Sequence, residues 1–356
     1  MATIDFGSAL SLKQAAKLAM ACPENRIFLE GEPGIGKSSL MSYFAEHLPG
    51  YSIGYIDCGN LDLGDVAMPC VDHEKMVTNY APNARFHLHE GKPVVIMLDE
   101  FTKAAPPVKN MLHPLLEVSN PRLGDIPLPA GSIVFLTGNL SSDGVGDSLP
   151  AHSRNRLTVV KVRKPDADQW LEWALSSGKI DPVMMAWVRQ VPHALASYTD
   201  EGQGDNPYIY NPKKGQKAYV SPRSLERGSN IVARRDQLDP EIVIASLAGT
   251  LGEPAARDIQ AYIDYQDELP SWDNVTTNPA TAPVPKSPGA CAVMVYGAIA
   301  KIDKGTITPF MKYLDRFDPE WQAAFAINVA KAPGKQAIAF SSKAFADWVQ
   351  ANEDLL

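Results

Sequence analysis

The chain has 356 residues, of which 45% are hydrophobic and 21% charged, as in ordinary globular proteins large enough for two or three domains. No apolar run approaches the roughly 18 residues of a membrane span, and the N-terminus lacks the basic and apolar stretches of a secretory signal. We therefore expect a cytoplasmic protein without a membrane segment, and the formal net charge of −8 argues against a broad basic surface for nucleic acid.

The first 163 residues alternate helical and strand-like patterns. Leu12 to Met20 place their apolar residues on one face of a helix that Ser11 can cap, and a helical pattern also covers residues 108–116 until Asn120-Pro121. Short strands are expected at residues 26–30, 51–57, 94–98, 133–137 and 157–162. Such alternation predicts an α/β domain with a mainly parallel sheet, in which the apolar run 94–98 is buried on both faces.

After residue 164 the patterns are helical, and four prolines between residues 279 and 288 indicate a linker. Helices are expected at 170–175, 183–191, 225–235, 255–266, 321–329 and 345–349, with a long polar loop at 201–219. We therefore predict three parts: an α/β core in residues 1–163, a helical domain in residues 164–270, and a Pro-rich linker with a helical extension in residues 271–356.

The four cysteines (Cys22, Cys58, Cys70 and Cys291) form no CxxC pair and have no histidine at the spacing of zinc ligands. We expect them to be buried free thiols.

Residues 31–38 read Gly-Glu-Pro-Gly-Ile-Gly-Lys-Ser and fit the P-loop pattern G-x4-G-K-[ST] in full. An apolar strand precedes the pattern and an apolar helix follows it, which favours a P-loop over an incidental glycine-rich turn. The glycines let backbone N–H groups surround a phosphate, Lys37 reaches the β- and γ-phosphates, and the Ser38 hydroxyl is a ligand for Mg²⁺. We assign ATP binding to Gly31, Glu32, Pro33, Gly34, Ile35, Gly36, Lys37, Ser38 and Ser39.

Residues 94–100 read Val-Val-Ile-Met-Leu-Asp-Glu, the Walker B pattern of an apolar strand that ends in two acidic residues. Asp99 can hold the Mg²⁺ shell, and Glu100 can act as the general base that activates water. Strands often end in acidic turns, but this pattern follows a complete P-loop at a suitable distance. Together the two segments predict an ATP–Mg²⁺ site.

Three further residues stand near strand ends. Asn139 follows the strand 133–137, where its amide can orient a water molecule between the two Walker segments or simply cap a turn. Arg154 and Arg156 precede the strand 157–162, and the local sequence leaves open whether they are functional or solvated surface arginines.

The order of these motifs resembles that of the AAA+ ATPases over about residues 8–270. The motifs are the P-loop, Leu98-Asp99-Glu100, Thr137-Gly138-Asn139, Ser153-Arg154-Asn155-Arg156 and Ser221-Pro222-Arg223-Ser224. The particular form is similar to the MoxR-like ATPases. Its supporting segments are Glu117-Val118 followed by Arg122-Leu123-Gly124-Asp125, and Gly252-Glu253-Pro254-Ala255-Ala256-Arg257. The chain departs from this family at Glu32, Ile35 and Leu157, where the family usually has Pro, Thr and Phe.

The resemblance implies that residues 164–270 are a lid and that Asn139 is the sensor 1 residue. It implies that Arg156 is an arginine finger for a neighbouring subunit, with Arg154 as the alternative, and that Arg223 is the sensor 2 residue, which binds the nucleotide from the lid. Family members form rings, typically hexameric, and remodel other proteins in a chaperone-like way, often beside a partner with a von Willebrand factor A domain. The extension 271–356 matches no known pattern.

An ATP-driven remodeller of protein partners is therefore the leading hypothesis. A nucleic-acid motor or restriction-type translocase would use the same ATP site, but the acidic chain shows no basic stripe interleaved with aromatics. A P-loop kinase of a small metabolite would need no arginine from a second subunit. The segment 62–89 either faces a partner or the pore of the ring, or forms a structured insertion packed on the sheet.

Overall fold

The computed structural model describes residues 9–140 and 151–353, and the chain divides into two compact units, Met1–Lys164 and Pro165–Leu356. The first unit holds a five-stranded sheet in the order β2-β5-β8-β1-β9, and all of its pairs are parallel. The strands are β1 (Ile27–Glu30), β2 (Ser52–Asp57), β5 (Val94–Asp99), β8 (Ile133–Gly138) and β9 (Thr158–Lys161). The expected α/β fold with a parallel sheet is confirmed.

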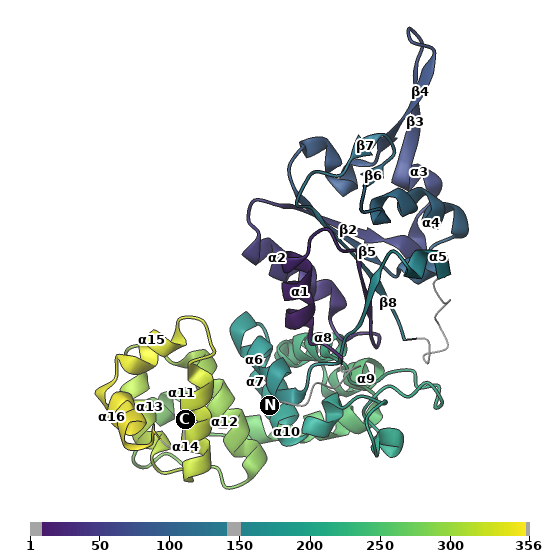
Figure 1. Cartoon of the computed structure of the whole chain (residues 1–356). Coiled ribbons are helices and arrows are strands. Elements are labelled where there is room, and N and C mark those ends of the chain that lie inside the picture. Colours follow the sequence, from purple (N-terminus) through teal and green to yellow (C-terminus); the bar gives the residue numbers. More distant parts are fainter. Residues whose placement is uncertain (1–8, 141–150, 354–356) are drawn as a thin grey trace, which may run out of the picture. The chain divides into compact units, whose positions relative to one another are not determined.

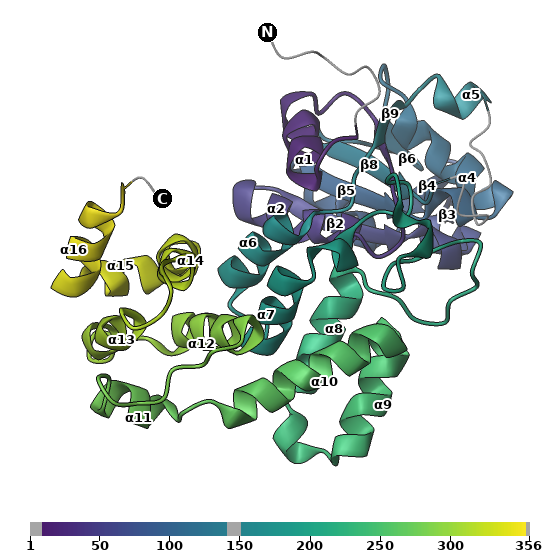
Figure 2. The same ribbon diagram turned by 90° about the horizontal axis from the view of Figure 1, so that it is seen from below.

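Helices cover both faces of this sheet, as Figures 1 and 2 show. Val95 and Met97 of β5 belong to the core that α1 (Leu12–Ala21) and α2 (Leu40–His47) share, whereas Ile96 and Leu98 belong to the core beneath α4 (Pro106–Leu112). Every residue from Val94 to Leu98 is fully buried, which explains the continuous apolar run. Burial of one such side chain contributes about 1.5–3 kcal/mol.

Two helix boundaries show how local chemistry sets the elements. Ser11 caps α1 in a capping box, because Gln14 N donates to Ser11 Oγ at 3.2 Å and Ser11 N donates to Gln14 Oε1 at 2.8 Å. The helix expected over 108–116 ends at Leu112 and continues as the 3-10 turn η6 (His113–Leu116). Pro114 explains the change, because its nitrogen carries no proton for an α-helical hydrogen bond.

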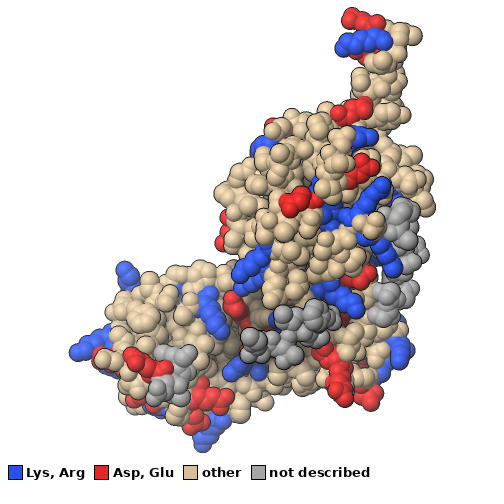
Figure 3. Space-filling model, viewed as in Figure 1, with Lys and Arg blue, Asp and Glu red and all other residues tan. Residues whose placement is uncertain are grey.

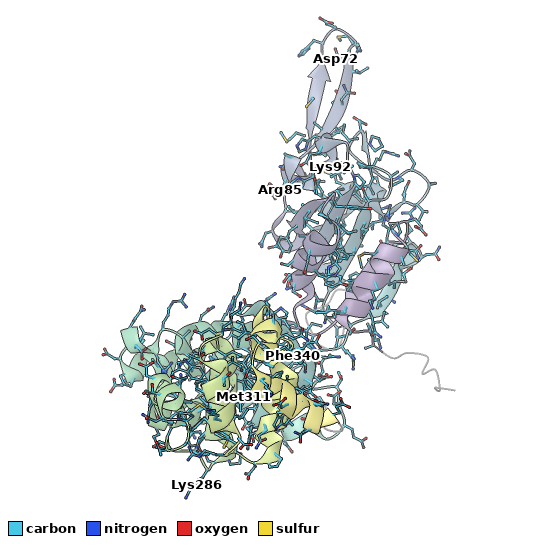
Figure 4. All side chains as sticks on the ribbon, turned by 90° about the vertical axis from the view of Figure 1, so that its left-hand side faces the viewer. Asp72, Arg85, Lys92, Lys286, Met311 and Phe340 are labelled. Atoms are coloured by element: carbon cyan, nitrogen blue, oxygen red, sulfur yellow. The ribbon has the colours of Figure 1, made fainter. Side chains whose placement is uncertain are left out.

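A hairpin stands on the first unit and carries most of the segment 62–89. It follows the short helix α3 (Leu63–Val66) and consists of the antiparallel strands β3 (Ala67–Asp72) and β4 (Val77–Pro82). Figure 1 shows the hairpin projecting beyond the sheet, and Figure 4 places Asp72 at its far end. The hairpin is therefore not packed on the sheet, and Cys70, which lies in it, is exposed instead of buried as expected.

The residues after the hairpin return to the body of the unit. Phe86, in the 3-10 turn η3 (Ala84–Phe86), and Leu88, in η4 (Leu88–Glu90), are both buried in the core under α4. A second, smaller hairpin of β6 (Arg122–Leu123) and β7 (Ile126–Pro127) precedes β8. The segment 62–89 thus combines an exposed hairpin with a buried anchor.

The second unit is helical. Its α-helices are α6 (Ala167–Ser177), α7 (Pro182–Gln190), α8 (Pro222–Val232), α9 (Pro240–Leu251), α10 (Glu253–Glu268), α11 (Trp272–Thr277), α12 (Pro288–Lys301), α13 (Ile307–Leu314), α14 (Pro319–Val329), α15 (Lys335–Phe340) and α16 (Lys343–Ala351). Figure 2 shows α8, α9 and α10 at one end of this unit and α13 to α16 at the other.

One hydrophobic core runs through this unit from Ala167 to Phe345. The helix α12 packs against α7, α10 and α14, and thereby joins the stretches that we expected to form a lid and a separate extension. The proline-rich segment between them is bound to α13 and the turn after it, since Tyr313 Oη donates to Pro283 O at 2.6 Å and Arg316 Nη1 donates to Ala282 O at 2.7 Å. The division into a lid and an extension stays a prediction.

Within the described ranges, no helix is both long enough and apolar enough to cross a lipid bilayer.

Candidate active site

The glycine-rich loop connects the carboxyl end of β1 to a helix, as the sequence predicts. The chain leaves β1 at Glu30 and enters the 3-10 turn η1 (Lys37–Ser39), which leads directly into α2. Gly36 has a φ of 97° and lies in the left-handed region that side chains rarely adopt, so glycine is needed for this turn. The loop thus places backbone N–H groups at the start of a helix, an arrangement that binds anions.

Side chains of the loop have separate tasks. The Lys37 ammonium donates to the carbonyl oxygens of Gly31 at 2.7 Å and Glu32 at 3.0 Å, so it lies over the loop itself. Ile35 is buried in the core shared with α1 and α2, which anchors the loop and accounts for an apolar residue at this position.

The two serines after Lys37 differ. Ser39 donates its hydroxyl to Gly36 O at 2.7 Å and so stabilises the turn. The half-buried Ser38 makes no side-chain hydrogen bond to another residue in ranges 9–140 and 151–353, so its hydroxyl is available as a ligand. Ser39 thus has a structural task, whereas the role of Ser38 as a ligand stays a prediction.

The carboxylate of Asp99 is held from both neighbouring strands. Thr137 in β8 donates its hydroxyl to Asp99 Oδ1, and Tyr55 in β2 donates its phenol to Asp99 Oδ2 at 2.6 Å. Because β5 lies between β2 and β8, one contact comes from each side. Hydrogen bonds to a carboxylate are among the stronger ones in proteins, so this pair fixes the orientation of Asp99.

Glu100 adopts a strained backbone conformation directly after β5. Its φ and ψ of 50° and 38° are left-handed, which costs a residue with a side chain about 1–2 kcal/mol. The Thr137 hydroxyl oxygen accepts the Glu100 N–H at 3.1 Å, and Lys103 Nζ lies 2.7 Å from Glu100 Oε1. Strain of this kind concentrates at functional sites.

Asn139 follows β8, which lies between β1 and β5 in the sheet. The carboxyl ends of these three parallel strands meet at one edge, and they carry the P-loop, Asn139 and the Asp99–Glu100 pair. The structure therefore places Asn139 between the two Walker segments, as expected from the sequence.

The donors at this edge suit magnesium. Mg²⁺ takes oxygen ligands and is held by one or two protein groups together with substrate phosphates and waters. The Ser38 hydroxyl and the Asp99 carboxylate are donors of this type. In the described residues no cluster of three or more His, Cys, Asp or Glu side chains could hold a metal by itself. The Ser38 hydroxyl and the Asp99 carboxylate are therefore the groups that could hold a Mg²⁺ ion here.

A thiol next to this edge is fully buried. Cys58 follows β2 and is fully buried, and burial raises the pKa of its thiol far above the usual range. The nearby carboxylates of Asp99 and Asp57 raise the pKa further. Since only the thiolate attacks, a fully buried thiol with a raised pKa is poorly suited to act as a nucleophile.

The two candidate arginine fingers, Arg154 and Arg156, lie on the surface of the first unit. Arg154 ends the short helix α5 (Ala151–Arg154) and is exposed. Arg156 is also exposed, and its Nη1 lies 2.7 Å from the ring nitrogens of His113 in η6. Arg223 lies in the second unit, exposed in the first turn of α8, where Ser221 and Ser224 form a capping box. The expected roles of these arginines stay predictions.

Sequence reasoning missed the contacts by which Tyr55, Thr137 and Lys103 orient Asp99 and Glu100. Thr137 gave a usable signal, because it is a fully buried hydroxyl in an otherwise apolar strand. A buried hydroxyl requires a hydrogen-bond partner, and the end of the neighbouring strand is an acidic pair.

The chain is similar to a known protein family over part of its length and to several solved structures. Residues 26–125 match the family of the AAA domain, dynein-related subfamily. This segment contains the P-loop, Asp99 and Glu100, so both Walker segments lie within the matched region. No curated protein sequence matches the chain.

Among solved structures, the chain is similar to NtrX from Brucella abortus in complex with ADP, with 13% identity and a TM-score of 0.40. The similarity covers 99% of this chain and 70% of that one. It is also similar to a variant of RuvB from Thermotoga maritima, with 15% identity and a TM-score of 0.35, over 74% of this chain and 73% of that one.

Proposed function

We propose that the chain hydrolyses ATP at the carboxyl edge of its parallel sheet and uses the reaction to remodel protein partners within a ring, as MoxR-like AAA+ ATPases do. The observation that carries this proposal is the convergence of the P-loop, Asp99, Glu100 and Asn139 at the ends of β1, β5 and β8. The AAA-domain match over residues 26–125 supports it.

Each residue then has a defined task toward ATP. Backbone N–H groups of the loop and the Lys37 ammonium bind the β- and γ-phosphates, while Ser38 and Asp99 supply oxygen ligands for Mg²⁺, which neutralises phosphate charge when bound. Glu100 accepts a proton from the attacking water, and Asn139 orients that water. Thr137 and Tyr55 keep the Asp99 carboxylate in place.

Proteins are a better partner class than nucleic acids because of the hairpin. Its exposed apolar side chains include Met68, Val71, Met76 and Tyr80, whose exposed fractions range from 46% to 84%. Figure 3 shows charged side chains of both signs at the tip and few along the strands. Exposed apolar surface of this kind marks protein contacts, whereas nucleic acid would require a basic groove.

The site is tested by measuring ATP binding by calorimetry and phosphate release with wild type, Lys37→Ala and Glu100→Gln. Lys37→Ala is expected to lose ATP binding, because it removes the P-loop ammonium. Glu100→Gln should bind ATP but hydrolyse it at least about a hundredfold more slowly, as for loss of a general base. Near-normal ATP affinity of Lys37→Ala would refute the site assignment.

A further inference from the structure

A pocket lies at the base of the β3–β4 hairpin. Its volume is about 610 Å³, and α3, the strands β3 and β4, η6 and the turn between β6 and β7 form its walls. Pockets that bind small ligands or side chains of a partner typically measure roughly 300–1,000 Å³. The size therefore suits a few side chains of a peptide.

Most of the lining is apolar. Leu63 and Met68 contribute from the hairpin side, and Met111 and Pro114 from the side of α4 and η6. Leu63 and Met68 are about half exposed, with exposed fractions of 47% and 56%. Methionine side chains adapt to ligands of different shape, so the walls can close on an apolar side chain.

Arg122 supplies a positive charge in the same lining. It is half-buried, and its guanidinium makes no hydrogen bond or ion pair with another residue in the described part of the chain. One oxygen of the Asp125 carboxylate, which lies in the same lining, is engaged by the hairpin, since Asp125 Oδ2 accepts Tyr80 N at 2.5 Å. A guanidinium with unused donors is complementary to a carboxylate, which it can bind through two parallel hydrogen bonds.

The pocket is preformed because the two hairpins are joined by their backbones. Besides the Tyr80–Asp125 contact, Asp125 N donates to Tyr80 O at 3.0 Å. Gly124 has a φ of +56°, and a Cβ atom there would lie 2.3 Å from Tyr80 O. Only glycine allows so close an approach, so the turn and β4 are held together.

We infer that this pocket binds a segment of a partner protein in which an apolar side chain is followed by an acidic one. The apolar side chain enters between Met68 and Met111, and the carboxylate binds Arg122. The inference rests on the proposed function and names the class of partner segment that the ATPase engages.

The experiment measures the anisotropy of three fluorescein-labelled peptides with the full chain in ATP and Mg²⁺, and phosphate release from the same preparation. The end-blocked peptides differ at two central residues, Leu-Glu, Leu-Gln or Ser-Glu, flanked by glycine and serine. We expect the Leu-Glu peptide to bind at least about tenfold more tightly than the others, as for one charge-assisted hydrogen bond.

Two variants test separately how the charge of Arg122 and the volume of the cavity contribute to peptide binding. Arg122→Gln should remove the preference for Glu over Gln. Gly64→Leu should weaken both leucine peptides, because its side chain extends from a Cβ that lies only 3.2 Å from Met68 Sδ and fills the cavity. The matched control Arg163→Gln removes an exposed arginine outside the lining. It should change neither the preference for Glu over Gln nor the affinity for the leucine peptides.

Equal binding of all three peptides, or an unchanged preference in Arg122→Gln, overturns the inference. Absence of peptide binding by a preparation that releases phosphate also overturns it and leaves the ATPase proposal intact. Absence of phosphate release instead contradicts the proposed function itself.

Discussion

Thr137 donates its hydroxyl to the carboxylate of Asp99, and its oxygen in turn accepts the N–H of Glu100 at 3.1 Å. One side chain of β8 therefore orients the proposed metal ligand and the backbone of the proposed base. The Thr137 side chain is fully buried, so water cannot replace either hydrogen bond.

We predict that Thr137→Val slows phosphate release about ten- to hundredfold while ATP still binds. Valine keeps the shape of threonine but leaves the Glu100 N–H without its acceptor, so stability to urea should fall by about 1–3 kcal/mol. The conservative variant Thr137→Ser keeps the hydroxyl and should retain most activity. Turnover of Thr137→Val within twofold of wild type would show that Asp99 needs no such contact.

Tyr55→Phe tests the other side of Asp99. Loss of the 2.6 Å contact to Oδ2 leaves Thr137 as the one described side chain that binds this carboxylate, so we expect a several-fold higher Mg²⁺ concentration for half-maximal activity. Stability should change little, because the Tyr55 side chain is about half exposed. Tyr51→Phe is a matched control, since the Tyr51 hydroxyl makes no hydrogen bond to another described residue. An equal Mg²⁺ requirement in both variants would contradict a positioning role for Tyr55.

The sequence was sufficient for residues whose chemistry follows from local spacing. Lys37, Ser38, Asp99 and Glu100 belong to short motifs, and the strand before each motif is apolar enough to be recognised. The contacts of Tyr55 and Thr137 with Asp99 depend on β5 lying between β2 and β8, and strand order is a property of the whole chain.

Two further parts of the fold could not be predicted from local sequence patterns. The hairpin β3–β4 has nearly all of its residues exposed, so it lacks the alternation of buried and exposed positions that marks a strand. In the second unit, α12 is buried on almost all sides and therefore has no amphipathic pattern to recognise.

A pH prediction follows from Glu90 at the end of η4. It accepts hydrogen bonds from Ser52 Oγ at 2.5 Å and His87 Nδ1 at 2.6 Å, and it pairs with Lys92 at 3.0 Å. These contacts lower the pKa of Glu90 to about 2 from its usual 4.5. The unfolded chain therefore binds a proton that the folded chain does not, and the resulting stability is lost as the pH falls from about 4.5 to about 2.

Glu90→Gln should accordingly flatten the decline of the urea midpoint between pH 5 and pH 3, an acid range about the usual carboxylate pKa. The matched control Glu46→Gln changes an exposed carboxylate of α2 and should leave the wild-type slope. A Glu90→Gln variant with the wild-type slope would show that this cluster does not determine the acid sensitivity.

The last prediction concerns the arginine that the family resemblance assigns to a neighbouring subunit. Arg156 is exposed beside His113, so its guanidinium can meet another subunit without unfolding its own surroundings. If it stabilises charge on a neighbour's γ-phosphate, Arg156→Ala should bind ATP almost normally but lose roughly three orders of magnitude or more in turnover. Arg154→Ala should have a weaker effect. Phosphate release and calorimetry measure both quantities.

Mixing makes this prediction specific for a ring. Arg156→Ala subunits keep an intact P-loop and Lys37→Ala subunits keep an intact finger, so each inactive variant supplies what the other lacks across an interface. The mixture should therefore regain activity, whereas Arg156→Ala mixed with Glu100→Gln,Arg156→Ala subunits should not, because no finger is present.

Mass measurement with ATP and Mg²⁺ should show an oligomer, expected to be a hexamer. Normal turnover by Arg156→Ala together with loss in Arg154→Ala would transfer the role to Arg154. Normal turnover by both would contradict an arginine finger in the segment that precedes β9, because Arg154 and Arg156 are its two candidates.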